Sequence, residues 1–303
     1  MLGRNVIGGS ITTIKRLRLS CPTVREMEPL FSAVICGCNA GLFREALHEV
    51  YIPRIQRGNA HFAANVLGAR GALLSVLACF FEHGRWGSLV EAGVEGQILN
   101  AEDQLFILME AGHLITAIQG MGEPEAALCY EREESLARSL KRFPSFYLAL
   151  VGQWRHSLNT DKLSATLQIA KRLYALAQEK NDSSLLIGAC AALAPTLHYL
   201  GDFEASGQWA IRGVQLWRSL GARSSLVGVD NAAVGILCHK ALFDAHIGDI
   251  TSSRATIAEA ISLAEELKDM YSLAMTLVHQ VRDWFSGVAI KMGRRQGATK
   301  EHI

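Results

Sequence analysis

Proline, aromatic residues and net charge are all scarce in this chain of 303 residues. Proline occurs 6 times, aromatic residues make up 7% of the chain, and 30 basic residues nearly balance 29 acidic ones, which leaves a formal charge of +1. So little proline excludes collagen-like and proline-rich disordered chains, and 50% hydrophobic residues indicate a folded globular protein. The small charge argues against direct nucleic-acid binding, because such proteins carry a basic stripe.

The few net charges are unevenly distributed. Residues 1–25 carry five basic residues and no acidic one, and residues 286–303 carry four basic residues and one acidic residue. These ends contribute +5 and +3, so residues 26–285 together carry −7. We expect a basic, poorly ordered segment over residues 1–26, a folded body over residues 27–285, and a basic tail over residues 286–303. DNA is not an expected partner of an acidic body.

Signatures of metal sites, secretion and membrane spans are missing. The seven cysteines are an odd number without CxxC spacing, which predicts buried thiols in a reducing cytoplasm. The ten histidines show no HExxH spacing, so we expect no metal and no cofactor. The longest apolar runs, residues 71–81 and 185–200, are too short or too interrupted to span a bilayer, so we expect no membrane partner.

Catalytic motifs are also missing, so we expect a protein that is not an enzyme. The chain has no GxxxxGK[ST] phosphate loop and no GxSxG nucleophile elbow. Acidic clusters at residues 131–134 and 259–266 contain carboxylates that could perform acid–base chemistry. On an amphipathic helix such a run is typically the solvated face, and we interpret both clusters in this way.

A short turn pattern recurs with a period near forty residues. Each copy has a glycine or aspartate at the turn, and most place a small residue five positions later, as in Gly201-Asp202-Phe203 with Ser206 and Gly248-Asp249-Ile250 with Ser253. In the most degenerate copy, at Gly84, the small residue is replaced by Leu89. The turn residues, separated by 43, 38, 39, 40 and 47 positions, are Gly41, Gly84, Gly122, Asp161, Gly201 and Gly248.

This pattern predicts a series of helical hairpins. Glycine or aspartate at the end of one helix can take the left-handed conformation that starts the turn into the next. We expect first helices over residues 105–119, 145–158, 185–200 and 232–246, with a kink at Pro195. One hairpin cannot bury its apolar face alone, so several must stack. The predicted fold is all-α, a right-handed superhelical stack of about six hairpins.

The Gly-Asp-Phe-x-x-small pattern, with leucine or alanine beyond it, resembles a tetratricopeptide repeat. Its longer and irregular period is similar to the divergent tetratricopeptide region of large bacterial signalling ATPases. Residues 51–69, 187–217 and 262–277 carry this resemblance most specifically, and it covers roughly residues 27–285. It implies a TPR-like α-solenoid from the regulatory or sensor arm of a signalling protein. The ATPase module that such proteins place before the repeats has no counterpart in this sequence.

Such an array would bind a ligand on its concave side, which is lined by the first helices. Counting back three and six positions from the turns nominates Gln119, Arg155 and His198 as polar contacts in an apolar groove. Arg155 suits a carboxylate or a backbone carbonyl. The alternative is that these side chains are only partly exposed or hydrogen-bonded within the array.

The sequence therefore leaves three functions open. The first is a scaffold that binds a protein or peptide, and the second is a helical repeat domain that senses a small-molecule effector. The third is a truncated remnant without independent function. Apolar end faces without capping repeats would also predict self-association.

Overall fold

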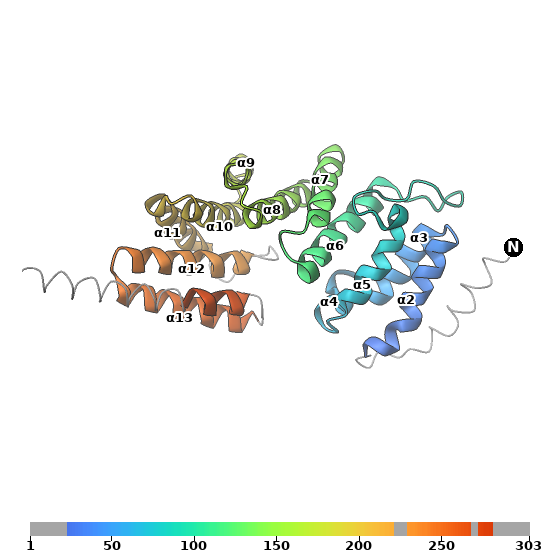
Figure 1. Ribbon diagram of the computed structural model, residues 1–303, viewed down its shortest axis with the longest axis horizontal. Helices are drawn as coiled ribbons and strands as arrows, with labels where there is room; N and C mark the ends of the chain where they lie inside the picture. The colour runs from blue at the N-terminus through green and yellow to red at the C-terminus, as the bar shows by residue number, and fades with distance from the viewer. Residues whose placement is uncertain (1–22, 221–228, 268–271, 281–303) are drawn as a thin grey trace, which may run out of the picture. The chain divides into compact units, whose positions relative to one another are not determined.

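Helices account for most of the described residues in the computed structural model, which are residues 23–220, 229–267 and 272–280 (Figure 1). Most of the expected basic segment 1–26 and all of the tail 286–303 lie outside them. Within these residues, β-pairing is limited to one isolated bridge, and none of their helices is both long and apolar enough to cross a membrane. Within each of the two units of the chain, the described helices pack against their neighbours in chain order, so the prediction of an all-α helical stack is confirmed.

The chain divides into two compact units, Met1–Thr160 and Asp161–Ile303, which are described separately below. The first unit contains α2 (Val24–Asn39), α3 (Phe43–Glu45), the π-helix η1 (Ala46–Ile55), η2 (Gly58–Ala60), α4 (Phe62–Asn65), α5 (Arg70–Leu77), η3 (Ala78–Phe80), η4 (Glu82–Gly84), α6 (Ala101–Gln119), α7 (Pro124–Ser139) and α8 (Phe143–Asn159). Helix α2 begins three residues before the expected start of the folded body, because Thr23 and Glu26 form a capping box there. The expected first helices 105–119 and 145–158 correspond to α6 and α8.

The second unit contains α9 (Leu163–Lys180), α10 (Ser183–Tyr199), α11 (Phe203–Leu220), α12 (Val229–His246) and α13 (Ile250–Glu266), followed by a helix over residues 272–280. The expected first helices 185–200 and 232–246 correspond to α10 and α12, and α10 continues through Pro195. Helices α12 and α13 lie side by side as one hairpin (Figure 1).

The expected hairpin at Gly84 does not form among the described residues. Gly84 has a left-handed φ of +68°, but no helix occupies residues 85–100. This irregular segment instead pairs with the Gly41 turn, where the Val94 N–H donates to the Gly41 carbonyl at 3.2 Å. Leu89, which stands where other copies have a small residue, is buried against the first unit's core. The large residue at this position is thus used for core packing, not for the approach of a second helix.

Other predicted turn residues mostly take the left-handed conformation. The φ angles of Gly41, Asp161, Gly201 and Gly248 are +73°, +55°, +84° and +88°. The turn before α7 differs, because its left-handed residue is Gly120, with φ of +115°, and not Gly122. A Cβ atom at Gly122 would lie 3.4 Å from the carbonyl oxygen at the end of α8. That glycine therefore marks a close approach between chain segments.

The small residue after the turn joins the two helices of a hairpin in the second unit. The Ser206 hydroxyl donates to the Ala194 carbonyl at 2.7 Å, and the Ser253 hydroxyl donates to the Ala241 carbonyl at 2.8 Å. Both serines are buried. The two bonds are equivalent and lie 47 residues apart, which is also the separation of the two turn glycines. In these two copies the sequence repeat is thus also a repeat of one specific contact.

A buried tyrosine packs between two successive first helices in the first unit. Tyr130 of α7 lies between Gly112 of α6 and Gly152 of α8. A Cβ atom at Gly112 would come within 2.7 Å of the tyrosine ring, and one at Gly152 within 2.5 Å. Both distances are shorter than real carbon contacts. The two glycines, 40 residues apart in successive first helices, are therefore what allows the ring to enter.

We predict that Gly152→Ala destabilises the protein by about 1 to 3 kcal/mol, because the new methyl group overpacks against a buried ring. Gly71→Ala is the matched control, since a Cβ atom at that helical position meets nothing within 4 Å. This control should be neutral or stabilising by up to about 1 kcal/mol. Urea unfolding followed by circular dichroism measures both, and equal effects of the two substitutions would contradict the packing described here.

We further predict that Ser206→Ala and Ser253→Ala each lower the free energy of unfolding by about 1 kcal/mol, through loss of a buried hydrogen bond. Ser219→Ala provides the control, because the Ser219 hydroxyl also donates to a helical carbonyl, at 2.7 Å, but is exposed. The control should change stability by less than about 0.5 kcal/mol. If Ser219→Ala lowered the free energy of unfolding as much as the two buried substitutions, burial of the inter-helix hydrogen bond would be unimportant.

Candidate functional site

The first helices of the first unit bring Arg155 close to groups that the sequence analysis did not nominate. Arg155 is exposed on α8, and its charge acts on His113 of α6 and on Tyr130 of α7. The ring centroids of His113 and Tyr130 are 6.3 Å apart. The Tyr130 hydroxyl and Thr116 Oγ1 form a hydrogen bond of 2.9 Å. This surface therefore carries a cation and an imidazole, beside the hydrogen bond between the buried Tyr130 and the partly buried Thr116.

His113 is neutral at pH 7 because its pKa is lowered to about 4. The largest cause is desolvation by the surrounding protein, and the positive charges of Arg155 and His61 lower the pKa further. Part of the residue nevertheless remains accessible to solvent. A neutral imidazole offers one donor and one acceptor to a ligand, beside a guanidinium that offers donors only.

A buried polar cluster lies on the same helix α6, one turn earlier. Glu110 Oε2 accepts hydrogen bonds from Gln56 Nε2 at 2.7 Å and from the Tyr51 hydroxyl at 3.3 Å. Its other oxygen, Oε1, lies 3.2 Å from Nδ1 of His61. Burial raises the pKa of Glu110, while His61, Gln56 and Tyr51 counteract that shift. Burial is also the main reason why the pKa of Tyr51 is raised.

An irregular backbone positions this cluster. Tyr51 belongs to the π-helix η1, which contains Pro53, and Gln56 is its C-cap residue. Arg57 and His61 then take left-handed conformations, with φ of +53° and +44°, although neither is glycine. π-Helices and left-handed non-glycine residues are both enriched at functional sites. No periodic pattern in the sequence signals this local geometry.

Gln119 is exposed as the last residue of α6. Gln119 and Arg155 belong to the first unit, whereas His198 belongs to the second.

Three histidines follow one another across the first helices of the second unit. His198 of α10 lies 6.0 Å from His239 of α12, and His239 lies 5.2 Å from His279 in the helix 272–280, measured between ring centroids. Steps of 41 and 40 residues separate them. His198 was nominated from the sequence, and the same period could have identified the other two. His239 Nδ1 donates to the Gly235 carbonyl at 3.0 Å, which fixes the tautomer of the neutral ring.

These histidines lie on the inner side of the second unit's hairpins. Among the described helices, the backbones of the first helices α10 and α12 approach each other at many positions. The backbones of the second helices α11 and α13 come close at few positions, and an ion pair of 2.6 Å between Arg218 and Glu259 links them. A stack whose first helices approach more closely than its second helices is curved toward the first helices. His198 and His239 are partly exposed on that side, and His279 is buried.

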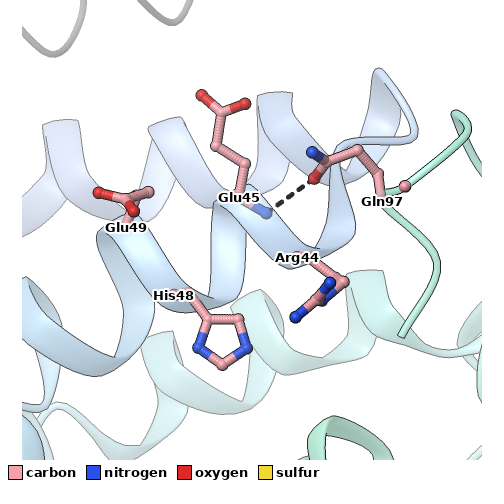
Figure 2. A pocket seen from close by; sticks show the side chains of 6 residues that line it. Arg44, Glu45, His48, Glu49 and Gln97 are labelled. Atoms are coloured by element: carbon pink, nitrogen blue, oxygen red, sulfur yellow. Dashed lines mark hydrogen bonds between the residues drawn. The ribbon is translucent and has the colours of Figure 1, made fainter. Parts of the chain in front are cut away.

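A shallow pocket of about 570 Å³ lies elsewhere in the first unit (Figure 2). Its lining residues are Arg44, Glu45, His48, Glu49, Gly96 and Gln97. Gln97 Oε1 accepts a hydrogen bond from the Glu45 N–H at 2.9 Å. The carboxylate of the buried Asp103 lies 3.2 Å from Arg44 Nε and 2.7 Å from His48 Nε2. Asp103 also belongs to the capping box of α6. These polar groups therefore tie α6 to the preceding helices, and we assign the pocket a structural role.

The acidic run at residues 131–134 is not wholly solvated, so its interpretation as a solvated face is wrong for Glu133. Glu131 is exposed, but Glu133 is only 1% exposed and its Oε1 has no hydrogen-bond partner in the described part of the chain. Burial raises the pKa of Glu133 to about 8. This carboxyl group is therefore mainly protonated at pH 7 in the folded protein.

Metal-binding geometry does not occur among the described residues, where no group of three or more histidine, cysteine or acidic side chains is suitably arranged. The described cysteines are not disulfide-bonded, and burial raises the pKa of both Cys129 and Cys238 to about 12. Such thiols stay protonated and unreactive.

No protein-family model matches the chain, and no curated protein is detectably similar to it in sequence. Function is therefore inferred from the two first-helix surfaces and not from a characterised relative.

We predict that Glu133→Gln makes stability less dependent on pH. The pKa of about 8 in the folded protein exceeds the ordinary value of 4.5, so the contribution of Glu133 to stability falls as pH rises between these values. The free energy of unfolding of Glu133→Gln minus that of the wild type should therefore increase by about 2 to 4 kcal/mol from pH 5 to pH 8. Glu131→Gln, on the exposed face of the same helix, should show no such rise in urea unfolding. A flat difference for Glu133→Gln would contradict its buried, protonated state.

Proposed function

We propose that this chain is a non-catalytic scaffold that binds a protein or peptide along the first helices of a right-handed, TPR-like array. In this proposal it serves in the cytoplasm as the regulatory arm of a bacterial signalling system. The observation that carries the proposal is the row formed by His198, His239 and His279, which supplies one imidazole per first helix on the inner side of the second unit.

Regular spacing of these rings favours an extended chain as the ligand. Their centroids are 6.0 and 5.2 Å apart, whereas every second residue of an extended peptide repeats at about 6.6 Å. The two partly exposed imidazoles, His198 and His239, could thus face successive peptide groups of similar orientation, while the buried His279 packs against His239. Imidazole nitrogens hydrogen-bond either backbone donors or backbone acceptors, depending on the tautomer.

Arg155 adds a charged contact on the first-helix surface of the first unit. Its guanidinium is exposed, and the neighbouring His113 is uncharged and partly accessible. This combination favours an acceptor-rich ligand group, such as a carboxylate or a run of backbone carbonyls.

A close charged pair in the second unit, Lys240 and Asp244, helps to hold two helices together. Lys240 Nζ lies 2.6 Å from Asp244 Oδ2, which also accepts the Ser252 hydroxyl at 2.8 Å. Lys240 Nζ also donates to Thr256 Oγ1 at 3.2 Å. The network joins α12 to α13 and is nearly buried, which suits a scaffold.

A specific observation favours small-molecule sensing as the second candidate. Gln56 is 1% exposed, and its Oε1 has no hydrogen-bond partner within the described residues. A buried amide oxygen without a partner is costly, and a bound ligand with a donor group would satisfy it.

We predict that Arg155→Ala and His198→Ala each weaken peptide binding about tenfold without lowering the melting temperature, because the truncated side chains are surface contacts. The peptides are selected from a random phage-displayed library on the whole wild-type chain, and their Kd values are measured by fluorescence anisotropy. Arg132→Ala is the control, since Arg132 is exposed on the second helix α7.

Unchanged affinity in both variants would refute this assignment of the binding surface. Failure to select any peptide, together with a melting temperature raised by members of a metabolite panel, would favour the small-molecule sensor instead.

A further inference from the structure

Four large hydrophobic side chains are exposed at the turn edge of the second unit. Tyr199, Leu200 and Phe203 lie at the turn between α10 and α11, and Ile247 lies at the turn between α12 and α13. Their exposed fractions are 54%, 43%, 38% and 61%. We name this set the edge patch. Its location differs from the first-helix surface, because it surrounds the hairpin turns.

Ring contacts show that the two turns adjoin each other. The Phe203 ring centroid lies 4.7 Å from that of His246, the residue before Ile247, and 5.2 Å from that of His198, the residue before Tyr199. Phe203 thus bridges the two turns. The four hydrophobic side chains therefore gather at one edge of adjacent hairpins and are not scattered singly over the surface.

The fold itself does not account for this exposure. Leu200 and Ile247 occupy equivalent positions, each directly before the glycine of its turn. A polar residue there would leave the turn geometry unchanged, since the left-handed residues are Gly201 and Gly248. Clustered apolar side chains that face water are unfavourable unless a partner covers them, and such clusters mark interaction sites.

The two turns of the edge patch carry acidic side chains, and the exposed Arg254 of α13 follows directly after the second turn segment. The turn segments 199–208 and 246–253 contain Asp202, Glu204 and Asp249, all exposed, and no lysine or arginine. Asp202 and Asp249 also cap their helices, because Oδ1 of each accepts a backbone N–H, from Ala205 at 3.1 Å and from Ser252 at 2.9 Å. The acidic rim is consequently held in place by the same turns that expose the hydrophobic side chains.

We propose that the edge patch is a docking surface for a basic amphipathic segment of a partner protein. The apolar side chains of that segment would cover Phe203, Ile247 and their neighbours, and its lysine or arginine side chains would face the three carboxylates. Apolar contact supplies most of the affinity in such an arrangement, while the rim charges select the sign of the partner. This site adjoins the first-helix surface at His198, whose ring lies 5.2 Å from that of Phe203, and it goes beyond the function proposed above.

The test uses two fluorescein-labelled 18-residue amphipathic peptides on the full chain, one of leucine and lysine and the other of leucine and glutamate at the same positions. Fluorescence anisotropy at 0.1 M salt should detect binding of the lysine peptide, and the glutamate peptide should bind at least tenfold more weakly. Ile247→Ser and Glu204→Lys should each weaken binding of the lysine peptide about five- to tenfold.

Matched substitutions keep this test specific. Val278→Ser removes a hydrophobic side chain of similar exposure, 56%, in the helix 272–280. Glu265→Lys reverses an exposed charge on α13. Both controls should bind the lysine peptide like the wild type. Arg155→Ala should also bind it like the wild type, although this variant is expected to weaken binding at the first-helix surface. The result for Arg155→Ala therefore distinguishes the two proposals. Thermal melts followed by circular dichroism verify that every variant is folded.

Several outcomes would overturn the proposal. Equal binding of both peptides would show that charge plays no part. Equal losses in the two controls would show only a general attraction to the acidic residues 26–285. No binding of the lysine peptide, combined with a concentration-dependent dimer in sedimentation that Ile247→Ser dissociates, would identify a second copy of this chain as the occupant.

Discussion

Close approach between neighbouring helices is the constraint on which the rest of this structure depends. No helical hairpin can bury its apolar face alone, so each must pack on the next. The Tyr130 ring enters between α6 and α8 because Gly112 and Gly152 lack side chains, and buried serine hydroxyls tie the second helices α11 and α13 to their first helices. Small residues at one-repeat spacing therefore decide where the helices lie.

This packing also determines which side chains remain available for binding. In the second unit, first helices that contact one another present one histidine each toward the inner side. In the first unit, Tyr130 carries its hydroxyl to Thr116, next to the surface that holds His113 and Arg155. Inter-helix packing and candidate ligand contacts thus share the same helices, and a change in helix spacing would alter both.

The two kinds of surface differ in their chemistry. In the proposed function, first-helix residues such as Arg155 and His239 would form hydrogen bonds with an extended ligand. The edge patch offers hydrophobic side chains, including Phe203 and Ile247, surrounded by carboxylates. A scaffold with both proposed surfaces would hold two partners of different chemical character at once.

The sequence by itself determined the helical class, the period near forty residues and most turn positions, because these depend on local propensities and on glycine or aspartate at helix ends. It also placed Arg155 and His198 on first helices. Only the tertiary structure decided the irregular segment after Gly84, the burial of Glu133 and the π-helical geometry that joins Gln56 to Glu110. Those features arise from contacts between residues distant in sequence, whose packing overrides the local pattern.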